Sequence, residues 1–252
     1  GGNDEKLTGI AISGNRVFMT GYTESADFPI VRPLQARLGG SSDAFLASVE
    51  HNFETLSFST YLGGSGKDSA WGVGLNQQGN PVVAGITESD DLPVTPDAPQ
   101  SRRAGQADAF LMKLDQSGQK LLFSTYYGGA GVDHAGYDGV NVAVSATGNI
   151  WMVGLTDSRD LTVPGGYHPH YGGGELDGFL VGFSSRGKLC YGTYTGGTAR
   201  YLLEGVTLAD GGSAVYAVGT VLRPVDKDSP KPDPKEKYGM FVIGLRAESN
   251  CR

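Results

Sequence analysis

Two histidines flanked by tyrosines form the segment with the clearest capacity for chemistry, at Tyr167, His168, His170 and Tyr171. A third histidine, His134, lies in an earlier glycine-rich loop. Two imidazoles at i and i+2 of an extended chain can face one way and bind Zn²⁺ or Cu²⁺. The tyrosines offer amphipathic contact area instead. Because a proline separates the histidines and no third ligand adjoins them, a metal site, an aromatic contact patch and plain loop packing all stay open.

Acidic residues close two related glycine-rich loops, GSGKD at Asp68 and GAGVD at Asp133. Asp4 or Glu5 occupies the matching region near the start of the chain, and Glu204 lies near it later on. A ring of carboxylates and carbonyls suits a hard cation such as Ca²⁺. The alternative is that these acids are solvated or cap strand ends. Asp68 and Asp133 are therefore candidate calcium ligands, and no cofactor is expected to be required.

A third pattern, T-x-S-x-D-[FL], occurs at residues 23–28, 87–92 and 156–161. Ser and Asp side chains in such a loop can bond backbone N–H groups and hold the loop open. Since a ligand site rarely needs the same residues in every copy, we expect a structural role. No GxSxG elbow, HExxH motif or P-loop occurs in the sequence, so we expect no catalytic residues.

Composition excludes several partners. The net charge is −7 and no basic stripe occurs, which argues against nucleic-acid binding. No apolar run approaches the ~18 residues of a membrane span. The sequence has forty glycines and few charged residues, which is typical of a turn-rich folded chain rather than a disordered one.

The two cysteines, Cys190 and Cys251, are too few for a disulfide framework. Alignment of the repeats described below puts them at nearly the same place on successive units. Such sites would be too far apart for the ~5.5 Å Cα separation of a disulfide. A bond would require the C-terminal tail to leave the repeat register, and the sequence leaves the pairing open.

The elements that position these residues come from a fourfold repeat. Gly-Gly pairs occur at residues 1–2, 63–64, 128–129 and 196–197, and three of them follow the related strings FSTYL, FSTYY and YGTYT. A DAF-type triplet recurs at residues 43–45, 108–110 and 177–179, and changes to GMF at 239–241. Landmarks that share one period indicate a repeat fold. We divide the chain into one domain of four repeats, at about residues 1–62, 63–127, 128–195 and 196–252.

Each repeat reads as four short strands separated by glycine-rich turns, with no helical periodicity. The predicted innermost strands lie near residues 9–12, 72–75, 140–144 and 205–208. The next strands lie near 17–22, 82–86, 150–155 and 214–218. Four antiparallel strands per repeat is the blade of a β-propeller. The expected fold is therefore all-β, a propeller of four blades of four antiparallel strands.

The ends of the chain predict how such a ring would close. The chain starts one strand late, with Gly1-Gly2 in place of a full TYLGG strand, and ends one strand early. We expect a strand upstream of Gly1 to complete the last blade and close a four-bladed ring. Otherwise the last blade stays incomplete, or the chain is a segment of a longer propeller.

Several strings in this repeat resemble the bacterial SBBP-type β-propeller repeat: FSTYLGGSGKD at residues 58–68, GNPVVAGITESDDLP at 79–93 and ADAFLMKLDQSG at 107–118. The resemblance covers nearly the whole chain and is most specific in the first three copies. The fourth copy lacks the acid of the DAF triplet and carries an insertion at residues 221–237. The resemblance implies a propeller in a secreted, periplasmic or cell-surface bacterial protein, and it implies no particular activity.

The lengths of the loops predict which face of the propeller carries the functional site. In each repeat the first and third connections are tight turns, whereas the second connections are long, at residues 24–42, 88–107, 157–176 and 221–237. Long loops on a rigid scaffold are where function usually lies. We expect Asp133, His134, Tyr167, His168, His170 and Tyr171 to form a binding rim there. The predicted function is a non-enzymatic binding or assembly module for a protein or glycan at a cell surface. The alternatives are an enzyme with its site at the channel mouth and a purely structural spacer.

Overall fold

β-strands make up the regular structure of this protein. The computed structural model describes residues 1–51, 54–136, 140–222, 239–246 and 251, and these contain no α-helix. One short 3₁₀ turn spans Asp210–Gly212. The strands form four antiparallel sheets that follow one another in sequence order. The predicted all-β class is therefore confirmed.

Each sheet corresponds to one sequence repeat. The first sheet contains β1 (Glu5–Ser13), β2 (Arg16–Thr23), β3 (Asp43–Glu50) and β4 (Leu56–Leu62). The second contains β5 (Asp68–Leu75), β6 (Pro81–Thr87), β7 (Asp108–Leu114) and β8 (Leu121–Tyr127). The third contains β10 (Val142–Val144), β11 (Ile150–Thr156), β12 (Asp177–Phe183) and β13 (Leu189–Thr195), with β9 (Asp133–His134) also paired to β11. The last contains β14 (Arg200–Ala209), β15 (Ala214–Leu222) and β16 (Gly239–Arg246).

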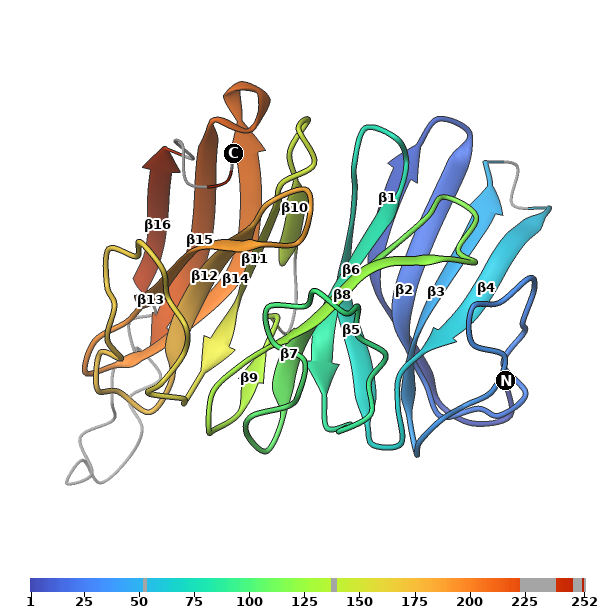
Figure 1. Ribbon diagram of the computed structural model, residues 1–252, viewed down its shortest axis with the longest axis horizontal. Coiled ribbons are helices and arrows are strands. Elements are labelled where there is room, and N and C mark those ends of the chain that lie inside the picture. Colours follow the sequence, from blue (N-terminus) through green and yellow to red (C-terminus); the bar gives the residue numbers. More distant parts are fainter. Residues whose placement is uncertain (52–53, 137–139, 223–238, 247–250, 252) are drawn as a thin grey trace.

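The turn chemistry of the sequence explains where the strands reverse. Gly14 and Gly79 join the first two strands of their sheets with φ of 57° and 74°, a left-handed backbone that glycine adopts without strain. Gly118 plays the same part at the third connection of the second sheet, with φ of 70°. These tight turns lie along the upper edge in Figure 1, and the long second connections lie along the lower edge. The expected separation of short and long loops is thus observed.

The four sheets stand side by side as an open row (Figure 1). Strands β1–β4 form one end of the row and β14–β16 form the other, with the second and third sheets between them. The closed four-bladed ring expected from the sequence is therefore not formed by the described residues. Among the described residues the last sheet has three strands, and β16 is at its edge.

The hydrophobic core lies between the sheets, in three clusters. Phe18, Leu46 and Phe58 of the first sheet pack with Val83 and Phe110 of the second. Similar clusters join the second sheet to the third and the third sheet to the last. A sheet can pack on both sides in this way because successive side chains of a strand point to opposite faces. Both faces of the second and third sheets are therefore covered by the neighbouring sheets.

A disulfide joins Cys190 to Cys251, with a Cα–Cα distance of 5.2 Å. The repeat alignment, which placed the two cysteines too far apart, was wrong on this point. Cys190 lies on β13, at the edge of the third sheet, so Cys251 lies against that sheet and not at the position in the last sheet that the repeat register predicts. The bond therefore ties the last repeat back to the preceding one.

The expected insertion at residues 221–237 lies almost wholly outside the described residues. Within the described part of the chain, no helix has the length and apolar character needed to cross a membrane.

Candidate functional site

A latch of hydrogen bonds joins the inter-sheet loops that precede the second and third sheets to the T-x-S-x-D loops of those sheets. In the second sheet, Ser89 Oγ donates to Asp68 Oδ2 at 2.7 Å and accepts from the backbone N–H of Gly66 at 2.8 Å. Asp91 Oδ1 accepts from the backbone and the hydroxyl of Ser65. The Thr87 hydroxyl accepts from the Ser89 N–H. All three conserved positions of the pattern therefore bond within the protein.

The third sheet repeats this latch with the equivalent residues. Ser158 Oγ donates to Asp133 Oδ2 at 2.7 Å and accepts from Gly131 N–H at 2.8 Å. Asp160 Oδ1 accepts from the N–H of Ala130. The first sheet has a related set, in which Glu5 replaces the aspartate and accepts from the Thr23 hydroxyl. The structural role expected for the T-x-S-x-D pattern is borne out in three copies.

The aspartate of each DAF triplet caps the long loop that precedes it. Asp43 accepts hydrogen bonds from the N–H groups of Gly39 and Gly40 and from Gln35 Nε2. Gln35 Oε1 in turn accepts from Gly63 N–H, so it connects the long loop to the inter-sheet loop. Gln100 makes the same two contacts in the second sheet, to Asp108 and Gly128. The two glutamines were missed by sequence reasoning, although each lies eight residues before its aspartate.

The DAF aspartate Asp43 and the latch aspartate Asp68 explain why a Gly-Gly pair recurs between the sheets. A Cβ at Gly63 would lie 2.7 Å from Asp68 Oδ2 and 2.8 Å from Asp43 Cγ. Gly64 is equally confined, because a Cβ there would lie 2.7 Å from Ser89 Cβ. Contacts this short exclude a side chain, so only glycine lets the two acids approach the backbone from both sides.

The tyrosine of each FSTY string also serves the latch. Tyr126 Oη donates to the carbonyl of Ser89 at 2.9 Å and accepts from Leu92 N–H at 2.9 Å. Tyr61 and Tyr194 make the equivalent bonds to the carbonyls of Ser25 and Ser158. The recurring motifs of the sequence therefore meet in one hydrogen-bonded structure at the base of the long-loop face.

Asp133 and His134 lie inside this structure and not on a rim, which corrects their expected exposure. Both are buried on β9, which pairs with β11. Burial raises the pKa of the Asp133 carboxyl to about 6, opposed by hydrogen bonds from the Gly129 N–H and the Ser158 hydroxyl. Burial lowers the pKa of His134 to about 4, and its Nδ1 bonds the carbonyl of Gly136. His134 is thus held neutral at pH 7.

The other four candidate residues lie on the third long loop. Tyr167 is 81% exposed, and its ring meets that of His168 edge-on with centroids 4.9 Å apart. His170 is exposed as well. Tyr171 is partly buried, because its ring packs against Tyr194 and its hydroxyl donates to the Gly174 carbonyl. The expected aromatic rim therefore exists on this loop without Asp133 and His134.

A polar hollow of about 430 Å³ opens beside this loop. Arg159 lies over the Tyr171 ring, 5.8 Å from its centroid, and Asp157, Asp160 and Glu175 supply carboxylates. One oxygen of Asp157 accepts from Val132 N–H, so the inter-sheet loop forms one wall. Asp160 is the aspartate of the third T-x-S-x-D pattern, whereas Asp157, Arg159 and Glu175 were not singled out from the sequence, although they belong to the predicted long loop.

No group of three or more His, Cys, Asp or Glu side chains is placed to hold a metal ion within the described ranges. Asp68 and Asp133 are both fully buried, and each has one oxygen bonded by a glycine N–H and a serine hydroxyl. Their second oxygens have no hydrogen-bond partner. The calcium expectation therefore stays a prediction, with a melting experiment as its test.

No protein-family model matches this chain, and no curated protein matches it either. The resemblance to the SBBP-type repeat thus stays an expectation from the sequence.

Proposed function

We propose that the four sheets are blades of a β-propeller whose long-loop face binds a ligand outside the cytoplasm, without catalysis. The blade interpretation is supported by four successive antiparallel sheets, each formed by one repeat and packed face to face on the next. The disulfide supports an extracytoplasmic location, because such bonds persist in oxidising compartments.

The observation that carries the binding proposal is the polar hollow beside the third long loop. Its carboxylates and Arg159 can accept and donate several hydrogen bonds at once, and Tyr171 contributes an aromatic face. The hydroxyls of a carbohydrate hydrogen-bond to such polar groups, and the C–H face of a sugar ring packs on an aromatic ring. A cell-surface glycan is therefore the favoured ligand. A protein partner is the second candidate, because Tyr167 and His168 project beyond the hollow as an exposed aromatic pair.

The enzyme alternative required a deep pocket lined by Asp133, His134 and His168. None of these three residues lines the hollow beside the third long loop. We therefore propose that the hollow binds its ligand without catalysing a reaction. The spacer alternative would leave this face without any ligand.

The test compares binding by the wild type and by the His168→Ala, Tyr171→Ala double variant on a glycan array and on native cell surfaces. We expect at least a tenfold loss of affinity in the double variant. The matched control is Gln77→Ala with Gln78→Ala, two exposed residues of a tight turn on the opposite face. Loss of binding in the control with retention in the double variant would show that the other face binds. Absence of binding by the folded wild type to either target would favour the spacer.

A further inference from the structure

The outward face of the first sheet exposes apolar positions that the repeat buries elsewhere. Ile10 on β1 is 61% exposed, whereas Val73 at the same position of β5 is 7% exposed. Leu7 is 54% exposed, and its counterpart Ala70 is fully buried. The bulges of the two strands confirm the alignment, because each follows directly after Leu7 or Ala70. Ile12 adds a third exposed apolar side chain to what we term the first face, at 69%.

The outward face of the last sheet also exposes apolar residues at positions that are buried in another sheet. These residues lie on the other side of their strands from the side that forms the first face. Val218 of β15 pairs with Val242 of β16, and they are 47% and 68% exposed. The equivalent pair in the second sheet, Ala84 with Leu111, is fully buried. Tyr216 lies on the same side as Val218 and is 42% exposed. We term these residues, with Met240 at 91%, the last face.

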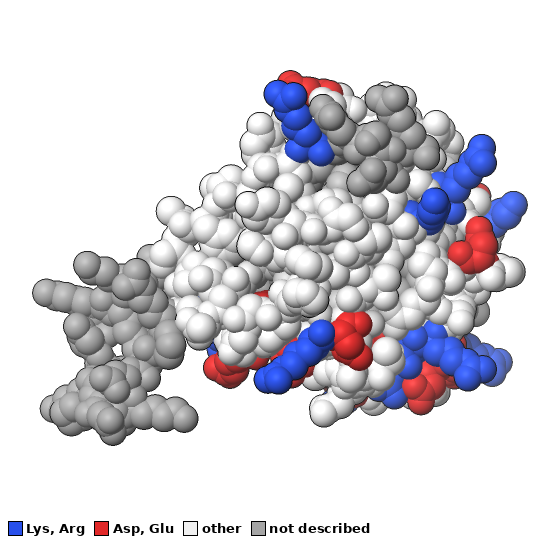
Figure 2. Space-filling view, turned by 60° about the vertical axis from the view of Figure 1, so that its left-hand side comes forward, with Lys and Arg blue, Asp and Glu red and all other residues white. Residues whose placement is uncertain are grey.

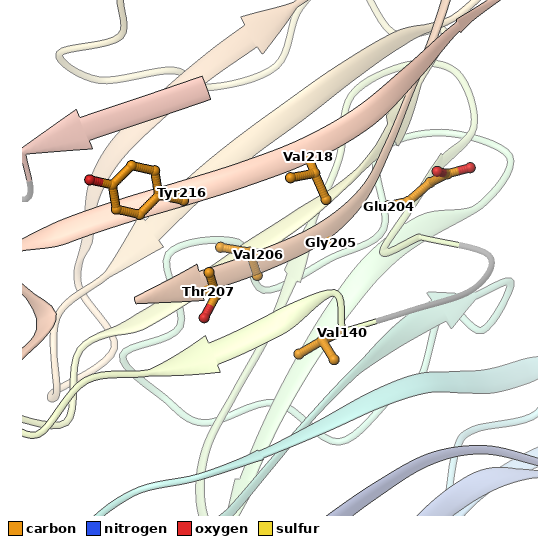
Figure 3. Close-up of a pocket in the computed structure, with 7 residues that line it drawn as sticks. All are labelled: Val140, Glu204, Gly205, Val206, Thr207, Tyr216 and Val218. Atoms are coloured by element: carbon orange, nitrogen blue, oxygen red, sulfur yellow. The ribbon is translucent and has the colours of Figure 1, made fainter. Parts of the chain in front are cut away.

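The last face is also hollowed, and Glu204 is the one charged residue among those that line the hollow. A cavity of about 510 Å³ opens on it, where Tyr216, Val218 and Val140 surround the backbone of β14 (Figure 3). When the β14–β16 end is turned forward, a broad uncharged surface is seen between charged upper and lower edges (Figure 2). Contiguous apolar surface on a soluble protein usually marks an interaction site.

The two faces are the complementary halves of an interface that occurs three times within the chain. At each junction within the chain, one sheet packs the face that corresponds to the first face. It packs this face against the side of the preceding sheet that corresponds to the last face. The first face and the last face are the two halves of this contact, and no sheet of the described residues covers either of them. From this continuity we propose that a second copy of this chain docks head to tail, with its first face on the last face of its neighbour.

Such a contact is heterologous, since two different surfaces meet, and a copy can therefore bind one neighbour at each end. Two first faces would not fit one another in this arrangement. This geometry concerns the ends of the row only and stands independently of any ligand on the long-loop face.

Two variants separate this contact from other forms of association. Ile10→Lys with Ile12→Lys charges the first face, and Val218→Lys with Val242→Lys charges the last face. The substituted side chains are more than two-fifths exposed, and thermal melting verifies that each variant folds. The matched control is His168→Lys with His170→Lys, which adds the same charge on the long-loop face.

The measurement is molar mass by sedimentation over a range of protein concentrations. We expect the wild type and the control to form dimers or larger assemblies and each face variant to stay at the 26.4 kDa of one chain. An equimolar mixture of the two face variants should recover a 1:1 dimer and nothing larger, because one intact face remains on each.

A monomeric wild type at every concentration would overturn the proposal. So would a dimer of the last-face variant alone, since it would have to form between two first faces. A monomeric wild type whose melting temperature rises when further repeats are fused to it would assign the faces to neighbours on the same polypeptide.

Discussion

Single serines hold the loops of this protein in place. Ser89 and Ser158 each donate to a buried aspartate and accept from a backbone N–H, so one hydroxyl satisfies a buried carboxylate and a partly buried N–H. A buried polar group that loses its partner costs more than the bond itself contributed. The latch serine is therefore the most sensitive small residue of each repeat.

We expect Ser89→Ala to lower the free energy of unfolding by about 1–3 kcal/mol, because Asp68 and Gly66 N–H lose a partner. The measurement is urea denaturation at pH 7. Ser101→Ala, at an exposed loop position, is the control and should change stability by less than about 0.5 kcal/mol. Equal stability of both variants would show that water replaces the hydroxyl without cost.

Asp133 and His134 respond to pH in opposite directions. The folded state keeps a proton on Asp133 up to about pH 6, whereas an unfolded aspartate loses it near pH ~3.9. Stability from this group is therefore lost as the pH rises from about 4 to about 6. Folded His134 binds a proton only below about pH 4, whereas an unfolded histidine binds it below about 6.5, so its contribution grows over much of the same interval.

Asp133→Asn should remove the first contribution and leave the second. We expect the variant to gain stability relative to the wild type as the pH rises from 4 to 6, by on the order of 2 kcal/mol. Urea denaturation at several pH values measures this difference. Asp97→Asn, at an exposed loop position, should show a constant offset from the wild type. A constant offset for Asp133→Asn as well would mean that Asp133 titrates normally in the folded protein.

At the scale of elements, the last sheet depends on a covalent link. Among the described residues it has three strands, whereas the first two sheets have four and the third has five, and β16 alternates exposed and partly buried residues. Phe241, Ile243 and Leu245 pack on the third sheet beside Cys251. The disulfide to β13 therefore anchors Cys251, which follows β16 in sequence, to the sheet before it.

Replacing both cysteines, Cys190→Ala with Cys251→Ala, should lower the free energy of unfolding by about 2–4 kcal/mol, because the bond closes a long loop of 61 residues. Hydrogen exchange should accelerate most in β14–β16. A reducing agent should destabilise the wild type by a similar amount and leave the variant unchanged. Uniform exchange across all four sheets would contradict the anchoring role.

At the scale of the whole molecule, the buried acids of successive inter-sheet loops raise the question of calcium. The calcium site predicted from the sequence implies a higher melting temperature in millimolar calcium than in EDTA. An ion that binds the folded state alone adds about 2.7 kcal/mol at a hundredfold excess over its Kd. The same melting temperature in both solutions would mean that the latch bonds alone satisfy these acids. A calcium-dependent rise that disappears in Asp68→Asn and Asp133→Asn would establish the ion site predicted from the sequence.

The sequence alone determined the repeat, the strands and the turns. These depend on local patterns: alternation of apolar residues, Gly-Asn turns, and motifs that recur with one period. The predicted inner strands fall within β1, β5 and β14 and overlap β10, and the T-x-S-x-D loops have the structural role expected of them. Backbone geometry over a few residues is sufficient for such features, so no long-range contact was needed to predict them.

Only the tertiary structure decided burial and closure. Asp133 and His134 belong to a loop in sequence, yet pairing of β9 with β11 buries them. Cys251 reaches Cys190 because the tail leaves its sheet, which no alignment of repeats contains. The row stays open, with Ile10 and Val218 exposed at its two ends, because the angle between successive sheets is set by side-chain packing across whole faces. That angle accumulates over the molecule, and the spacing of motifs along the chain does not encode it.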